Sequence, residues 1–139
     1  MILVWLQVVA CIGILASGQT IAEHRGLIAL QIVGLILGFS AVWTMRIGGF
    51  NLHPTVRSTA QLVTNGPYRL IRNPMYTALL LVFTPPVIGQ RAIIQVACLM
   101  LLIVVLALKI RAEERILRAH FPGYGAYAAR TKRILPGLI

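Results

Sequence analysis

Two of the three carboxylates in the chain are adjacent, Glu113 and Glu114, within a segment that is otherwise basic. The segment is predicted to be helical, and Glu114 then shares a face with three apolar residues, Ile110, Leu117 and Phe121. A purely structural interpretation is that Glu114 with Arg118, and Lys109 with Glu113, form i,i+4 ion pairs of about 0.2–0.5 kcal/mol each. Acids anywhere on this basic segment would serve that purpose. Their adjacency therefore favours a functional pair that binds a cationic group of a ligand.

A polar loop precedes a helix that is predicted to begin near Pro74. Gly66-Pro67 predicts a turn in the loop, which leaves Tyr68 and Arg72 just before the helix N-terminus. Free backbone N–H groups and a guanidinium converge there, an arrangement that favours a carboxylate or a phosphate. The alternative has equal weight on these residues alone: the arginines contact lipid headgroups, and Tyr68 and Tyr76 belong to an aromatic belt.

Several other kinds of site have no motif in the sequence. There is no glycine-rich nucleotide-binding loop and no spacing typical of a metal site, and the three histidines are scattered at His24, His53 and His120. No Asp, Glu, Lys, Arg or His lies within the apolar runs, which disfavours a proton-coupled carrier. We expect neither a bound metal nor a nucleic-acid partner.

The elements that must position these residues are apolar helices. With 58% of 139 residues apolar and 12% charged, the chain is not an ordinary water-soluble globule. Uncharged runs predict an all-α integral membrane protein of one domain, with helices at about 1–20, 26–45, 75–90 and 92–121. The last two helices form a predicted hairpin, and Pro85-Pro86 should kink or end the first of them. The polar remainder is a loop at 46–74 and a helical tail at 109–139.

The charges predict how these helices cross the membrane. If all four cross, 11 of the 13 lysines and arginines fall on the side that holds the N-terminus, the 46–74 loop and the tail. By the positive-inside rule that side is cytoplasmic, so we expect a multi-pass protein with both termini in the cytoplasm. The first run lacks the positive start of a signal peptide and is expected to remain as a helix. The pattern Gly34-Leu-Ile-Leu-Gly38 favours close packing inside the protein over a dimer contact.

Two blocks of sequence, Leu62 to Ala78 and Lys109 to Pro136, flank the predicted hairpin. In this order they resemble the isoprenylcysteine carboxyl methyltransferase family and the related phospholipid methyltransferases, which are integral-membrane enzymes that use S-adenosylmethionine. The family blocks read LVTxGxYxxxRHPxYxG and RxxxEExxLxxxFG. Asn73 replaces the usual family histidine, which removes a titratable imidazole, and Lys109 replaces a frequent arginine.

The resemblance implies an S-adenosylmethionine pocket between the loop and the tail, at the cytoplasmic end of the hairpin. It assigns to the pocket nine residues of this chain, Gln61, Leu62, Val63, Tyr68, Asn73, Pro74, Met75, Tyr76 and Glu113. From the local chemistry described above we add Arg72 and Glu114. Lys109 matches a family arginine near the substrate, and Arg111 is the second candidate for the same catalytic role.

Methyl transfer from a sulfonium is an in-line displacement that depends mainly on alignment of the reacting atoms. A carboxylate acceptor is already nucleophilic and needs only a cation such as Lys109 to place it, whereas an amine must first lose a proton. The basic tail therefore favours a carboxylate on a lipophilic substrate that enters from the bilayer. The alternatives are a phospholipid amine N-methyltransferase, an NADPH-dependent sterol-type reductase, and a non-enzymatic lipid-binding membrane protein. The sequence leaves the oligomeric state open.

Overall fold

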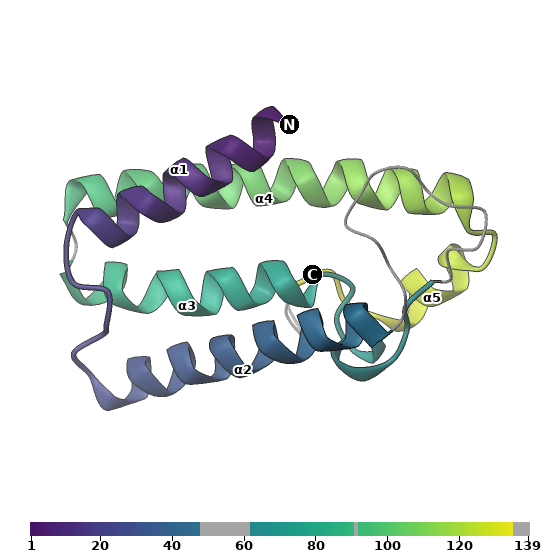
Figure 1. The fold of residues 1–139 in the computed structure, drawn as a ribbon, viewed down its shortest axis with the longest axis horizontal. Helices are drawn as coiled ribbons and strands as arrows, with labels where there is room; N and C mark the ends of the chain where they lie inside the picture. The colour runs from purple at the N-terminus through teal and green to yellow at the C-terminus, as the bar shows by residue number, and fades with distance from the viewer. Residues whose placement is uncertain (48–61, 91, 135–139) are drawn as a thin grey trace.

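The computed structural model describes residues 1–47, 62–90 and 92–134, and its regular elements there are all helical, as predicted. In chain order they are α1 (Ile2–Ala16), α2 (Arg25–Ile47), the short 3-10 helix η1 (Gly66–Arg69), α3 (Pro74–Gln90), α4 (Ile93–His120) and α5 (Tyr124–Arg130). Figure 1 shows α3 and α4 running in opposite directions side by side, which confirms the predicted hairpin.

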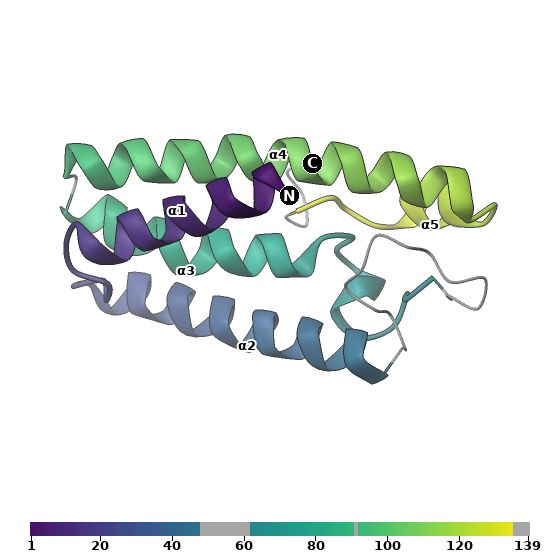
Figure 2. The same cartoon turned by 45° about the horizontal axis from the view of Figure 1, so that its top comes forward.

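The bundle is built from two closely packed helix pairs. α1 lies along the first half of α4, and α2 lies along α3 (Figures 1 and 2). A core joins the pairs where small and branched side chains meet, namely Ala10, Ile14, Val87, Leu99, Leu102 and Leu106. The end of α2, η1, the start of α3 and α5 gather at one end of the bundle, so the described part of the polar loop lies beside the described part of the tail, as predicted.

Glycine allows α2 and α3 to approach closely. A Cβ added at Gly34 would lie 2.8 Å from the Cβ of Leu81 and 3.1 Å from the carbonyl of Ala78, and one added at Gly38 would lie 3.2 Å from the Cβ of Ala78. Both glycines of the Gly34–Gly38 pattern therefore face α3 of the same chain. This confirms the prediction of packing within the protein.

The two prolines of α3 lie inside the helix, which continues to Gln90. The sequence predicts that these prolines kink or end a helix at 75–90, and of the two alternatives the helix does not end there. A neighbouring helix supplies the donor that one of the prolines lacks. Pro86 cannot donate to the carbonyl of Val82, but the side-chain amide of Gln31 does so at 3.1 Å. Gln31 also bonds the backbone of Thr20 and Ala22 at 2.9 Å each, so one buried amide ties three segments together.

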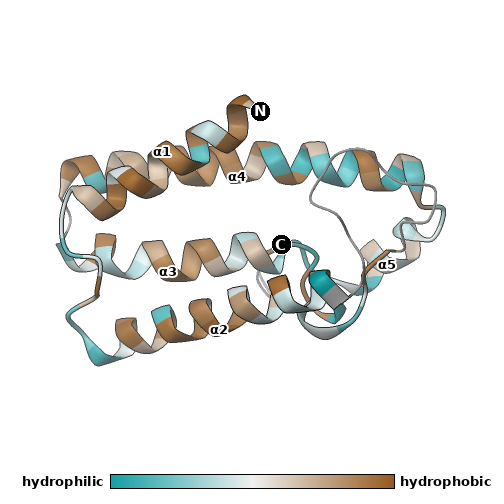
Figure 3. Ribbon diagram, in the orientation of Figure 1, coloured by the Kyte–Doolittle hydropathy of each residue, from teal (hydrophilic) through white to brown (hydrophobic). Residues whose placement is uncertain are grey.

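Two helices, over Arg25–Arg46 and Ile93–His120, are long and apolar enough to cross a membrane. Their apolar side chains are largely exposed, and Figure 3 shows the apolar residues on α1, α2 and the first half of α4, with polar residues towards the end of α4. α1 has 15 residues and α3 has 17, so they are about 22–26 Å long against a hydrocarbon core of about 30 Å. Membrane crossing is thus supported for two of the four predicted spans and remains a prediction for α1 and α3.

Candidate functional site

The residues after α5 pair with the residues before α3. The backbone N–H of Arg72 donates to the carbonyl of Lys132 at 2.7 Å, and that of Asn73 donates to the carbonyl of Arg133 at 3.2 Å. Lys132 returns a bond to the carbonyl of Leu70 at 3.0 Å, and the side-chain amide of Asn73 adds a second bond to Arg133 at 3.1 Å. The chain itself therefore occupies two of the N–H groups that the sequence analysis expected to be free for an anion.

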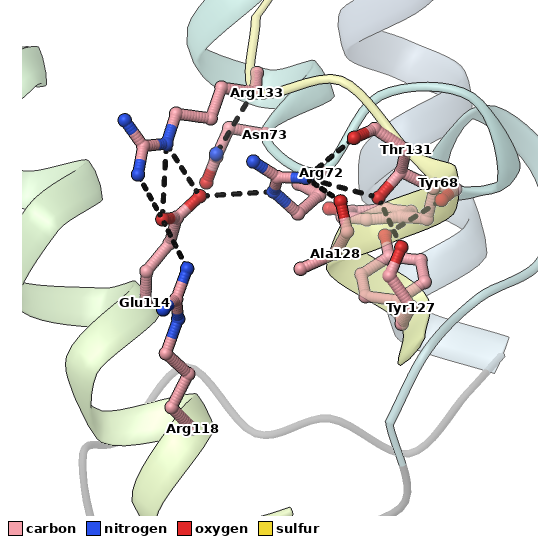
Figure 4. A network of polar contacts seen from close by, with 9 residues as sticks. All are labelled: Tyr68, Arg72, Asn73, Glu114, Arg118, Tyr127, Ala128, Thr131 and Arg133. Atoms are coloured by element: carbon pink, nitrogen blue, oxygen red, sulfur yellow. Dashed lines mark hydrogen bonds and ion pairs between the residues drawn. The ribbon is translucent and has the colours of Figure 1, made fainter. Parts of the chain in front are cut away.

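The Arg72 guanidinium is bonded to two other parts of the protein. Its Nε donates to Glu114 Oε1 at 3.0 Å, and its Nη1 donates to the carbonyls of Ala128 and Thr131 at 2.6 and 2.5 Å. The side chains of Arg72 and Glu114 are only 10% and 6% exposed. Figure 4 shows this guanidinium between α4 and the segment that follows α5. Arg72 thus joins the loop, α4 and the tail.

Two further guanidinium groups lie close to the Glu114 carboxylate. Arg133 Nη2 lies 3.1 Å from Glu114 Oε2, and Arg118 Nη2 lies 4.0 Å from the same oxygen (Figure 4). The predicted i,i+4 contact with Arg118 is therefore present, but it is the longest of the three. We call Arg72, Glu114, Arg118 and Arg133 the Arg72–Glu114 cluster. Its single carboxylate is shared by three cations, and its buried contacts fix the tail against the loop.

Three tyrosines line the same end of the bundle as neutral groups. Tyr127 Oη donates to the backbone carbonyl of Tyr68 at 2.7 Å, and the rings of Tyr124 and Tyr127 meet edge to face with centroids 5.9 Å apart. Burial is the main cause that raises the pKa of Tyr68 and of Tyr127 to about 12. At physiological pH these phenols are protonated and can donate hydrogen bonds.

A second group of polar side chains comes from three helices, α1, α3 and α4. Tyr76 Oη donates to Glu113 Oε1 at 2.5 Å, and Lys109 Nζ donates to Gln7 Oε1 at 2.7 Å. The Lys109 ammonium also lies 5.0 Å from the centroid of the Tyr76 ring, a cation–π distance. We call Gln7, Tyr76, Lys109 and Glu113 the Tyr76 cluster. It brings the predicted catalytic residue Lys109 together with two predicted cofactor residues.

The ion pair between Lys109 and Glu113, which belonged to the purely structural interpretation, does not form. Within the described ranges 1–47, 62–90 and 92–134, no carboxylate oxygen lies within 4.0 Å of Lys109 Nζ. The physical reason is that both groups have other hydrogen-bond partners: Tyr76 donates to the Glu113 carboxylate, and the Lys109 ammonium donates to Gln7.

The remaining predicted residues are more dispersed. Gln61 lies outside the described residues. Leu62, Val63 and Met75 are half-buried, and Pro74 is buried as the first residue of α3. Arg111 is exposed, and among the described residues it makes no hydrogen bond or ion pair.

Two residues of these clusters were missed by the sequence analysis. Gln7 carried one signal, since it is the only amide side chain in the apolar sequence of α1. Arg133 carried no such signal, because it reaches Glu114 only after the chain has turned back past α5.

A shallow depression of about 350 Å³ lies away from both clusters, along the turn of Gly18, Gln19, Thr20 and Ile21, and none of these residues is ionisable.

The geometry can be compared with known proteins. Residues 24–123 match the model of the phospholipid methyltransferase family. The cobalt-zinc-cadmium resistance protein CzcN of Cupriavidus metallidurans is 34% identical over 111 residues, which cover 75% of this chain and 50% of CzcN. The chain thus spans about half the length of this curated relative. No solved structure matches.

Proposed function

The chain belongs to the phospholipid methyltransferase family, and from this premise we propose that it transfers a methyl group from S-adenosylmethionine to a lipophilic acceptor in the membrane. The observation that carries the proposal is the Tyr76 cluster, in which a carboxylate and an ammonium are held a few ångströms from one tyrosine. The cluster lies on the helices that begin or extend into the polar end of the bundle.

The donor set fits this cofactor in chemical terms. Glu113 offers a carboxylate to an ammonium or to ribose hydroxyls, while Leu62, Val63 and Met75 offer half-buried apolar surface to an adenine ring. Tyr68 adds a neutral phenol, Asn73 and Gln61 belong to the same loop by their place in the sequence, and Pro74 follows that loop as the first residue of α3. Arg72 and Glu114 would act by holding the loop against the tail. When bound, S-adenosylmethionine supplies an electrophilic methyl group on a sulfonium.

We assign to Lys109, with Arg111 as the second candidate, the placement of the acceptor. Tyr76 orients Glu113 by its hydrogen bond, and Gln7 and the Tyr76 ring orient the Lys109 ammonium. An ammonium without a carboxylate partner among the described residues suits an anionic acceptor. A carboxylate acceptor would need no general base, so alignment and exclusion of water are the main tasks of the protein.

The test uses the purified chain in detergent and S-adenosylmethionine binding by calorimetry. Glu113→Gln should raise Kd about tenfold or more, since a charge-assisted hydrogen bond contributes about 1.5–3 kcal/mol. Tyr76→Phe should act in the same direction by releasing Glu113. The matched control is Glu23→Gln, which removes an exposed carboxylate in the turn between α1 and α2 and should leave Kd unchanged. Absence of binding to the unmodified chain would refute the proposal.

A phospholipid amine is the second candidate acceptor, and the family description favours it. Amine transfer would require Glu113 to accept a proton, so Glu113→Gln would then abolish turnover as well as weaken cofactor binding. Membranes incubated with methyl-labelled S-adenosylmethionine distinguish the two, because label in a methyl ester is released by mild alkali and label on an amine is not.

A further inference from the structure

The ammonium of Lys109 has an unusual set of partners. It is half-buried, it donates to the neutral amide oxygen of Gln7 at 2.7 Å, and it lies over the face of Tyr76. A lysine ammonium carries three N–H donors, and one amide oxygen and one ring do not neutralise its charge. The part of the chain that the structure describes offers it no carboxylate within 4.0 Å.

Gln7 explains why Lys109 does not turn to Glu113. The two residues are one helical turn apart on α4, a spacing at which lysine and glutamate commonly pair. The Tyr76 hydroxyl donates a hydrogen bond to the Glu113 carboxylate, and the Gln7 oxygen accepts one from the Lys109 ammonium on the side of α1. Without the Gln7 oxygen, the flexible lysine stem would be free to swing back to the carboxylate.

Gln7 also lies outside the residues that match the family model. The family match begins at residue 24, after the end of α1. Along α1, Gln7 is flanked by Val4 and Val8, which are 50% and 40% exposed, and so this part of the helix presents apolar surface outward. The Lys109 ammonium therefore lies beside a surface that suits an acyl or prenyl chain.

We propose that Gln7 is a positioning residue that keeps Lys109 available for the anionic headgroup of an amphiphile at the lipid side of the site. The proposal rests on the proposed function and adds α1 to the substrate site. The shared chemistry is a long apolar chain that ends in an anion, either a carboxylate or a phosphate monoester.

The experiment measures binding of three probes to the full chain in detergent: oleate, oleyl phosphate and uncharged oleyl alcohol. The unmodified chain should bind at least one anionic probe about tenfold more tightly than the alcohol. Gln7→Glu places a carboxylate 2.7 Å from where the ammonium now lies and should reduce that preference to about twofold or less. Affinity for the alcohol should not change. The matched control Gln90→Glu adds the same charge at the C-terminal end of α3 and should keep the preference.

A second variant guards against a folding defect. Gln7→Asn adds no charge but withdraws the amide oxygen, so it should lower the anion preference while the thermal midpoint stays near that of the unmodified chain. The inference is overturned if the unmodified chain binds neither anion more tightly than the alcohol, or if Gln7→Glu retains the preference. S-adenosylmethionine titration of the unmodified chain in the same preparation separates the two proposals, because cofactor binding tests the proposed function and the preference for an anionic probe tests this inference. The preferred probe identifies the headgroup as carboxylate or phosphate.

Discussion

At the scale of single residues, Glu114 is the side chain on which the polar end most depends. Its replacement by alanine would leave the guanidiniums of Arg72 and Arg133 facing one another without a shared carboxylate. Loss of one member of a buried ion pair is strongly destabilising, so we predict that Glu114→Ala lowers the free energy of unfolding by about 3 kcal/mol. Denaturant titration in detergent, followed by circular dichroism, measures this change.

Arg118→Gln provides the comparison for Glu114→Ala. The Arg118 side chain is 58% exposed and its nitrogen lies 4.0 Å from Glu114, so its removal should change the free energy of unfolding by about 1 kcal/mol or less. Equal effects of the two substitutions would contradict the view that the buried contacts hold the tail.

The tyrosines predict how stability responds to alkali. Burial raises the pKa of Tyr68 and Tyr127 to about 12, from an ordinary value near 10. Below pH of about 10 both the folded and unfolded chains carry neutral phenols; between about 10 and 12 mainly the unfolded chain ionises, so the folded state loses stability as pH rises. Thermal unfolding measured across this range should show the decline. Tyr68→Phe should make the decline shallower, and an unchanged slope would argue against a buried Tyr68 phenol.

Helical periodicity indicated one of the contacts within α4, whereas contacts with other segments decided which i,i+4 pair forms. The buried position of Glu114 and its approach to Arg118 follow from helical periodicity alone. Periodicity did not predict that Arg133 contacts Glu114 or that Gln7 contacts Lys109. These contacts depend on how the tail turns back and on how α1 lies against α4. Local spacing carries no information about either arrangement, and so it does not show that the i,i+4 pair Lys109–Glu113 of the purely structural interpretation is replaced by contacts with Tyr76 and Gln7.

At the scale of elements, one amide replaces a donor that proline removes from α3. Gln31→Leu deletes the bond to the carbonyl of Val82 and should destabilise the bundle by about 1–3 kcal/mol. Pro86→Ala restores a backbone N–H that can reach the same carbonyl within the helix. The double variant should therefore lose less stability than Gln31→Leu alone, as measured by unfolding in detergent. The restoration should be partial, because Gln31 also bonds Thr20 and Ala22.

If the changes in unfolding free energy caused by Gln31→Leu and Pro86→Ala simply add in the double variant, Gln31 does not compensate for the N–H that Pro86 lacks. Gln90→Leu is the matched control, since the Gln90 side-chain oxygen accepts a bond from the N–H of Gln19 in a turn and has no contact with a carbonyl that proline leaves free. Gln90→Leu should show no coupling to Pro86→Ala.

Helix boundaries were predicted well where charge marks them. The predicted helices at 26–45 and 92–121 differ by two residues or fewer at each end from α2 and α4. α1 ends at Ala16, whereas the sequence predicted a helix to about residue 20. Gly18 and the polar residues after it form a turn, and no charged residue marks its start in the sequence. The predicted helix at 75–90 differs from α3 by one residue at its start, but the bond from Gln31 to the carbonyl that Pro86 leaves free does not follow from the sequence of α3 alone.

At the scale of the whole molecule, the arrangement of helix ends together with the distribution of lysine and arginine predicts an orientation in the membrane. The loop before α3 and the turn between α1 and α2 lie at opposite ends of the bundle (Figure 1). In a background with Cys11 and Cys98 replaced by alanine, a membrane-impermeant maleimide should label Thr64→Cys only from the cytoplasmic side and Glu23→Cys only from the other side. Labelling of both from one side would contradict the crossing of α2.

The pairing between the loop and the tail has a consequence for biosynthesis. Arg72 completes its bonds with Thr131, which lies 59 residues later in the chain. At a synthesis rate of about 5–20 residues per second, Arg72 is added to the chain about 3–12 s before Thr131. Through that interval α3 and α4 can enter the membrane while the polar end is still open. The nascent protein would therefore acquire its bundle first and its closed polar end afterwards.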